Sequence, residues 1–69
     1  MIYYFAIEHE NDRIFKGSHK GSHLYKELSS LKRSFAANKR MYNLKDYNAF
    51  SLDTENMRII DLGNCEEVL

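Results

Sequence analysis

The sequence predicts a small α+β domain: an antiparallel sheet in the order β-β-α-β-β, with one helix packed on one of its faces. Three observations lead to this class. Aromatic and aliphatic residues alternate near the start of the chain, leucines recur at helical spacing in its middle, and alternation returns toward its end. The chain has 69 residues, which suits a single domain over residues 1–69 with a small core.

The first strand is expected at about residues 2–9, in the run MIYYFAIEHE. Tyrosine, phenylalanine and isoleucine are dense there, and they favour a pleated, half-buried surface. The odd-numbered side chains are the bulkier set, so we predict that their face, with Tyr3, Phe5 and Ile7, points to the core. Tyr4 is then expected on the face that no helix covers.

A returning strand is expected at about residues 13–16, after a turn that contains asparagine and aspartate. Its register depends on the length of the turn, because one additional residue exchanges its two faces. Either Ile14 or Phe15 could therefore share the face of Ile7, and the sequence leaves both arrangements open.

The helix is expected at about residues 23–40. Four apolar residues there follow an i, i+4, i+7, i+11 spacing, which places them on one stripe of a helix. They are Leu24, Leu28, Leu31 and Phe35. Asn43 is the predicted stop.

Positive charge is concentrated on this predicted helix. Residues 20–40 hold six lysines or arginines against one glutamate, whereas residues 41–69 hold two against six acidic residues, although the whole chain is neutral. Lys26, Arg33 and Arg40 recur every seven residues on the face away from the apolar stripe. Such a row is typical of a helix that contacts nucleic-acid phosphates or an acidic protein surface.

Two surfaces are therefore candidates for binding: the basic helix face and the open face of the sheet. Aromatic residues on an uncovered face favour an interaction site, and exposed strand edges are compatible with a homodimer. The candidate partner-binding residues are Lys26, Lys32, Arg33, Lys39, Arg40, Tyr25 and Tyr4.

Two further strands are expected at about residues 48–53 and 57–62, separated by the turn-forming run DTEN. A four-residue loop is expected to place Phe50 opposite Ile59. The last residues, CEEVL, are expected to form a short acidic tail.

Two Gly-Ser-His triplets stand before the predicted helix, in the run GSHKGSH. A metal site is disfavoured because His19 and His23 do not share a helix and zinc needs three or four ligands. A phosphate-binding loop is disfavoured because the Gly-Lys-Ser/Thr ending is absent. The favoured interpretation is a helix start in which Ser22 caps the first turn. We therefore expect neither a metal nor a cofactor.

Catalysis and secretion are both disfavoured. The sequence places no nucleophile beside a base, and the acidic neighbours of Cys65 are expected to raise the pKa of its thiol. A single cysteine allows no internal disulfide, and the chain shows neither a signal-peptide pattern nor an apolar run long enough to span a bilayer. We expect a cytoplasmic protein that is not an enzyme.

The run RIFKGSHKGSHLYKELSSLKRSF resembles a pattern in small tailed-phage accessory proteins. In that pattern a hairpin ends in a Lys-Gly step, and a polar loop leads to an aromatic-Lys-x-Leu-x-x-Leu-Lys helix. The matching residues are Phe15, Lys16, Gly17, Tyr25, Lys26, Leu28, Leu31, Lys32 and Phe35. The resemblance covers about a third of the chain. It implies a phage accessory origin and carries over no functional residues, and small phage proteins of this sort often look like inhibitors of host or defence proteins.

The expected function is that of a small non-catalytic binding protein. We expect a phage-encoded inhibitor or modulator that binds a host or defence protein, in the host cytoplasm, through the basic helix face or the open sheet face. The alternative is a small nucleic-acid-binding protein whose basic helix contacts phosphates, which predicts a steep loss of affinity with salt.

Overall fold

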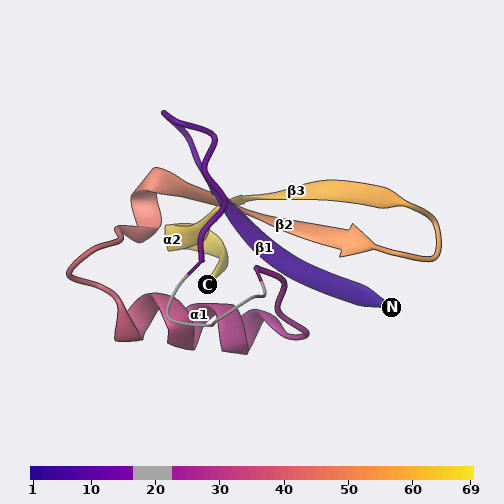
Figure 1. The fold of residues 1–69 in the computed structure, drawn as a ribbon, viewed down its shortest axis with the longest axis horizontal. Coiled ribbons are helices and arrows are strands. Elements are labelled where there is room, and N and C mark those ends of the chain that lie inside the picture. The colour runs from indigo at the N-terminus through magenta and orange to yellow at the C-terminus, as the bar shows by residue number, and fades with distance from the viewer. Residues whose placement is uncertain (17–22) are drawn as a thin grey trace.

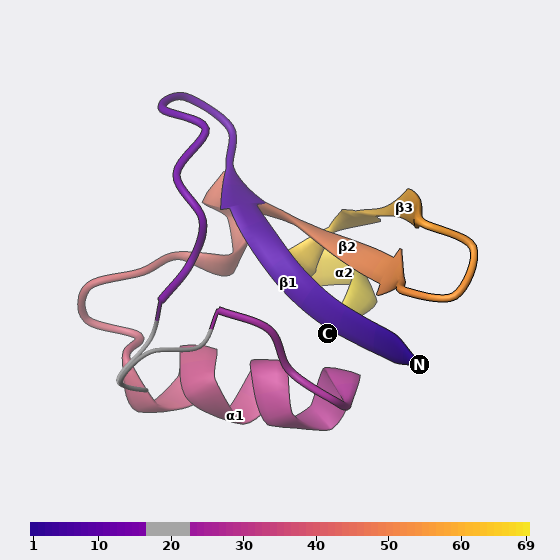
Figure 2. The same ribbon diagram turned by 45° about the vertical axis from the view of Figure 1, so that its right-hand side comes forward.

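The computed structural model describes residues 1–16 and 23–69. In chain order the elements are β1 (Ile2–Glu8), α1 (Leu28–Ala37), the short 3₁₀ helix η1 (Leu44–Asp46), β2 (Tyr47–Asp53), β3 (Arg58–Asn64) and α2 (Cys65–Val68). The strands form an antiparallel sheet in the order β1-β2-β3, and α1 lies on one side of it (Figures 1 and 2). The α+β class is confirmed, but the sheet of the described residues has three strands rather than four.

Residues 13–16 do not form the predicted second strand. They meet the outer edge of β1 at an isolated bridge between Ile7 and Ile14, and the Phe15 amide donates to the Ala6 carbonyl at 2.8 Å. Ile14 therefore shares the face of Ile7, whereas Phe15 points to the opposite face and is 1% exposed. The Glu8 amide also donates to the Arg13 carbonyl at 2.8 Å, so the segment bonds to β1 at two points and places the Phe15 ring in the core.

Helix α1 is shorter than the predicted helix at residues 23–40. Tyr25 is extended rather than helical, because its amide and carbonyl both bond to Tyr4 of β1, at 2.8 and 2.7 Å. The helix therefore begins only at Leu28, with Glu27 in the N-cap position.

The ends of α1 also differ from the expectation. Residues 17–22, which include His19 and the predicted cap Ser22, lie outside the described part of the chain. The N-cap position of α1 belongs to Glu27, whose side chain makes no capping hydrogen bond. The helix stops at Ala37, and the side-chain amide of Asn38 donates to the Ser34 carbonyl at 2.8 Å. That bond satisfies one of the carbonyls that a helix end leaves without a partner.

The even-numbered face of β1, not the odd-numbered face, packs on the helix. Ala6 pairs with Ala49 across β1 and β2, and both alanines are fully buried. Their small side chains leave room for rings from the helical layer. The buried core consists of Ala6, Phe15, Tyr25, Leu31, Phe35, Tyr47, Ala49 and Cys65. The predicted assignment of the two faces is therefore wrong.

An aromatic cluster holds α1 against the sheet. Phe15 and Phe35 stack with ring centroids 3.9 Å apart and planes 8° from parallel. Tyr42 and Tyr47 each meet the Phe15 ring edge-on, at 4.8 and 5.8 Å. These rings come from four separate segments, so the cluster joins both layers, and the two edge-on contacts have the geometry that aromatic pairs favour.

The β2–β3 hairpin has the expected four-residue loop, at residues 54–57. Leu52 pairs with Ile59, and Phe50 pairs with Asp61 rather than with Ile59 as predicted. Asp53 closes the turn by accepting the side-chain amide of Asn56 at 2.8 Å, and this bond holds the pKa of Asp53 below its usual value.

The C-terminal residues form α2 instead of a tail. Gly63 has a φ of +106°, in the left-handed region that suits glycine, and it lies within β3 where the register with β2 shifts between Ala49 and Phe50. The Asn64 side chain then accepts the Glu66 amide at 2.9 Å and caps the helix. This turn places Cys65 in the core.

The hydrogen bond from Tyr25 to Ser34 offers a test of the Tyr25 position. The Tyr25 hydroxyl donates to the Ser34 hydroxyl at 3.0 Å inside the core. We expect Tyr25→Phe and Ser34→Ala each to lower the free energy of unfolding by about 1 kcal/mol. Urea denaturation of both single variants and the double variant measures this. The double variant should lose little more than either single one, and fully additive losses would contradict a shared bond.

Candidate functional site

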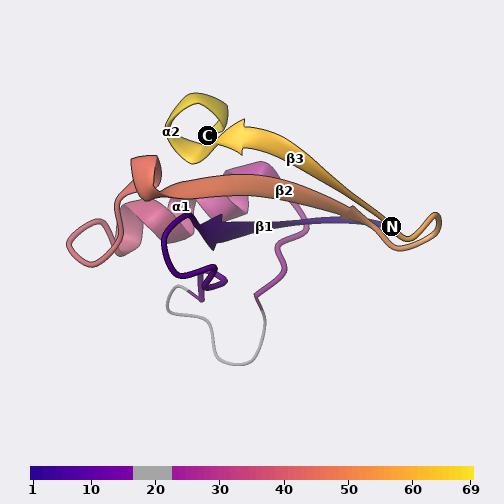
Figure 3. The ribbon, with the colours of Figure 1, turned by 90° about the horizontal axis from the view of Figure 1, so that it is seen from above.

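The face of the sheet away from α1 is apolar, and we call it the open sheet face. It carries Tyr3, Phe5, Ile7, Ile14, Phe50, Leu52 and Ile59, as the strand registers and the Ile7–Ile14 bridge require. Figure 3 views the sheet from this side, with the strands in front of α1. Neither α1 nor α2 lies on this face.

A pair of stacked rings forms the centre of the open sheet face. Phe5 and Phe50 lie directly opposite each other on β1 and β2, with ring centroids 5.3 Å apart and planes 13° from parallel. Phe5 is only 7% exposed, and one side of its ring is covered by Phe50. Phe50 and Leu52 are partly exposed, and Ile59 at the β3 edge is 63% exposed. The rings at the centre therefore pack against each other, and neither α1 nor α2 covers them.

A chain of polar side chains borders one end of this face. Asn48 accepts a hydrogen bond from His9 Nε2 at 2.6 Å, which requires the proton of that imidazole on Nε2. Asn48 donates in turn to both Asp61 oxygens, at 3.2 and 3.3 Å. Asp61 also accepts the Gly63 amide at 2.9 Å. These bonds hold a polar rim, which includes the Asp61 carboxylate, beside an apolar centre.

The two tyrosines predicted to bind a partner lie in or against the core. Tyr25 is 5% exposed and packs under α1. Tyr4 lies on the even-numbered face of β1 and packs against the same cluster. Their positions follow from the exchange of the two faces of β1 and from the extended conformation of Tyr25.

The predicted basic row is interrupted. A seven-residue repeat lies on one face only where a helix is continuous. Of its three members, Arg33 lies within α1, whereas Lys26 precedes the helix and Arg40 follows it. All three are exposed.

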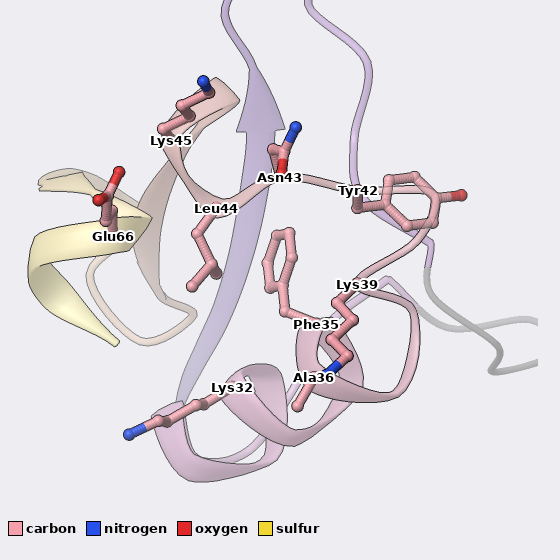
Figure 4. Close-up of a pocket in the computed structure, with 9 residues that line it drawn as sticks. All are labelled: Lys32, Phe35, Ala36, Lys39, Tyr42, Asn43, Leu44, Lys45 and Glu66. Atoms are coloured by element: carbon pink, nitrogen blue, oxygen red, sulfur yellow. The ribbon is translucent and has the colours of Figure 1, made fainter.

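Lys32 and Lys39 lie instead at a groove between α1, η1 and α2, which we call the lysine groove (Figure 4). It has a volume of about 480 Å³. Its apolar lining comes from Phe35, Ala36, Tyr42 and Leu44. Lys45 adds a third cation, and Glu66 of α2 is the acidic residue in the lining.

The structure brings together side chains that sequence patterns did not connect. Lys45 follows Leu44 in a short 3₁₀ turn, which carries no periodic signal. Phe5 and Phe50 were visible as strand residues, but alternation alone does not say which face the helix covers.

Residues 1–16 and 23–69 contain no group of three or more His, Cys, Asp or Glu side chains that could hold a metal ion. Within the same ranges, the helices are too short or too polar to cross a membrane. A small acidic hollow is lined by Glu8, His9, Glu10 and Asp46.

The thiol of Cys65 is fully buried. Burial raises its pKa from 9.0 to about 11. The predicted direction is therefore right, but the cause is desolvation rather than the acidic neighbours. A buried neutral thiol is a poor nucleophile, so the structure places Cys65 among the packing residues.

No protein-family model matches the chain, and neither a curated protein nor a solved structure matches it significantly. Function is therefore inferred from the residues and geometry of this chain.

The raised pKa of Cys65 predicts a loss of stability at alkaline pH. Below about pH 9 the thiol is neutral in both states, and above this pH the unfolded chain loses the proton first. The free energy of unfolding should fall by about 2–3 kcal/mol between pH 9 and 11, at 1.36 kcal/mol per pKa unit. Denaturation at a series of pH values measures the slope.

Cys65→Ala is the control for this pH dependence. It should flatten most of the slope and leave a smaller part from Tyr47, whose pKa burial also raises. An unchanged slope in Cys65→Ala would show that the thiol is not its source.

Proposed function

We propose that this chain is a non-catalytic protein-binding module, a phage-encoded inhibitor or modulator that covers a surface of a host or defence protein. One observation carries the proposal. The open sheet face presents aromatic and aliphatic side chains around the Phe5–Phe50 stack, and neither α1 nor α2 covers them. The phage origin rests on the resemblance of residues 13–35 to tailed-phage accessory proteins.

The composition of the open sheet face favours association with another protein. Protein interfaces combine an apolar, aromatic centre with a polar rim. Here Phe5 and Phe50 occupy the centre, and the bonded chain of His9, Asn48 and Asp61 borders it. A partner that covers the face would gain about 25 cal/mol of binding free energy for each Å² of apolar surface removed from water. A partner with an apolar surface therefore fits best.

The same face is a poor match for nucleic acid. Phosphate contacts are made mainly by lysine, arginine and other hydrogen-bond donors, whereas the polar rim ends in the carboxylate of Asp61. Phe5 and Phe50 also stack on each other, so each ring already has one of its faces occupied.

The first experiment is affinity capture from a nuclease-treated bacterial lysate, with the tagged chain as bait. Leu52→Lys and Ile59→Lys place a charge on the open sheet face, and Met41→Lys makes the same change at a side chain that is 77% exposed and off that face. One stoichiometric protein should bind the parent chain and Met41→Lys, and be lost from both face variants. Capture should persist in about 1 M salt, where the Debye length is about 3 Å.

Two results would overturn the proposal. One is a captured protein that both face variants retain. The other is the absence of a captured protein when nucleic acid is recovered from untreated lysate. Circular dichroism and urea denaturation of the variants distinguish a lost surface from a lost fold. Ile59→Lys is the safer variant in this respect, because its side chain is already largely in water.

A further inference from the structure

We propose that the lysine groove is a second binding site, which accepts an acidic peptide segment of a partner protein with an apolar anchor side chain. This site lies in the helical layer, on the opposite side of the sheet from the open sheet face (Figures 1 and 4). It does not depend on the function proposed above, because the purified chain and a synthetic peptide suffice to test it.

The floor of the groove is apolar and firmly held. Phe35 contributes to it, and the same ring is stacked on Phe15 in the core. Leu44 faces Phe35 across the groove (Figure 4). Ala36 is exposed and small, so it leaves space at the wall. The volume of about 480 Å³ falls in the range of ligand pockets, about 300–1,000 Å³. One aromatic or leucine side chain can enter it.

The rim of the groove selects for negative charge. Lys32, Lys39 and Lys45 outnumber Glu66 by three to one, for a net charge of +2. None of these lysines has an ion pair among the described residues, where the single recorded pair joins the Met1 amino group to Glu55. Their ammonium groups are therefore open to carboxylates of a partner. Several such pairs would orient the segment and speed its association.

The placement of the lysines favours a peptide over a ligand with one buried anion. In Figure 4 the side chains of Lys32 and Lys45 extend outward from different sides of the rim, away from the floor. This arrangement suits carboxylates that flank an apolar anchor along a chain. A nucleic-acid backbone carries a charge at every step, whereas a peptide can place an uncharged apolar side chain between its carboxylates, opposite the floor formed by Phe35 and Leu44.

The test is a titration of the ¹⁵N-labelled chain followed by NMR, with an acetylated Asp-Glu-Phe-Glu-Asp peptide as the probe. Amide shifts are expected at Ala36, Lys39, Leu44 and Glu66, and not at Leu52 or Ile59. A peptide in which serine replaces the phenylalanine should bind at least several-fold more weakly, because it lacks the anchor. Binding should also weaken with salt, since the charge pairs lie at the surface.

Two triple variants separate the groove from general charge. Lys32/Lys39/Lys45→Glu reverses the rim and should weaken binding about tenfold or more, as three surface pairs become repulsive. Lys26/Arg33/Arg40→Glu makes the same change in net charge outside the groove, and it should weaken binding much less. Equal losses in the two variants would overturn the proposal.

Ala36→Tyr tests the groove without a change in charge. The new ring should fill the space above Phe35 and weaken peptide binding, and position 36 is exposed enough to accept it. This variant also decides the matter if a triple variant does not fold. An Ala36→Tyr variant that folds and binds the peptide with unaltered affinity would contradict the site.

Three other results would overturn the inference. They are shifts confined to the open sheet face, tighter binding of an oligothymidylate than of the peptide, and tighter binding of dodecanoate than of the peptide. The first would move the acidic segment to the other site. The second and third would replace the peptide with a nucleic acid or with an amphipathic small molecule. If the parent chain does not bind the peptide but still captures a protein from the lysate, this inference is refuted and the proposed function is unaffected.

Discussion

The backbone hydrogen bonds along the outer edge of β1 are the constraint on which the rest of the structure depends. The Ala6 carbonyl accepts a hydrogen bond from the Phe15 amide, and the amides of Tyr4 and Tyr25 each donate to the carbonyl of the other residue. These contacts satisfy polar groups that an unpaired edge would expose. They also bring two aromatic side chains from outside the sheet beneath its even-numbered face. That face becomes the core, and the other is left open.

The aromatic cluster follows from this anchoring. Once Phe15 lies under the sheet, Phe35 stacks on it and fixes the position of α1. Tyr42 packs on the same ring, so the chain after α1 runs close to the helix before β2 begins. The lysine groove forms where that return segment passes α1 and α2. A groove whose floor includes the stacked Phe35 ring is thus a by-product of the packing that builds the core.

The two candidate surfaces lie on different layers of the fold and differ in polarity. The open sheet face is apolar, and its two central rings, Phe5 and Phe50, stack on each other. The lysine groove combines a small apolar floor with cations that have no described ion pair. An apolar face provides affinity that salt barely changes, whereas charge at a rim provides orientation and faster association. These two surfaces suit a small chain, which has room for only one hydrophobic core.

Local sequence determined the types of β1, α1, β2 and β3, but it did not determine the single bridge at residues 13–16 or the helix α2. Alternating residues formed β1, β2 and β3, helical spacing formed α1, and the four-residue loop of the second hairpin was expected. Tertiary structure alone decided which face of β1 is buried, because Ala6 and Ala49 make room for rings that arrive from distant segments. It also delayed the start of the helix to Leu28, because the amide and the carbonyl of Tyr25 bond to Tyr4 and not within a helical turn. Lys45 joined Lys32 and Lys39 only through the path of the return segment. Alternation and periodicity describe one element at a time, and they contain no information about which distant element will cover it.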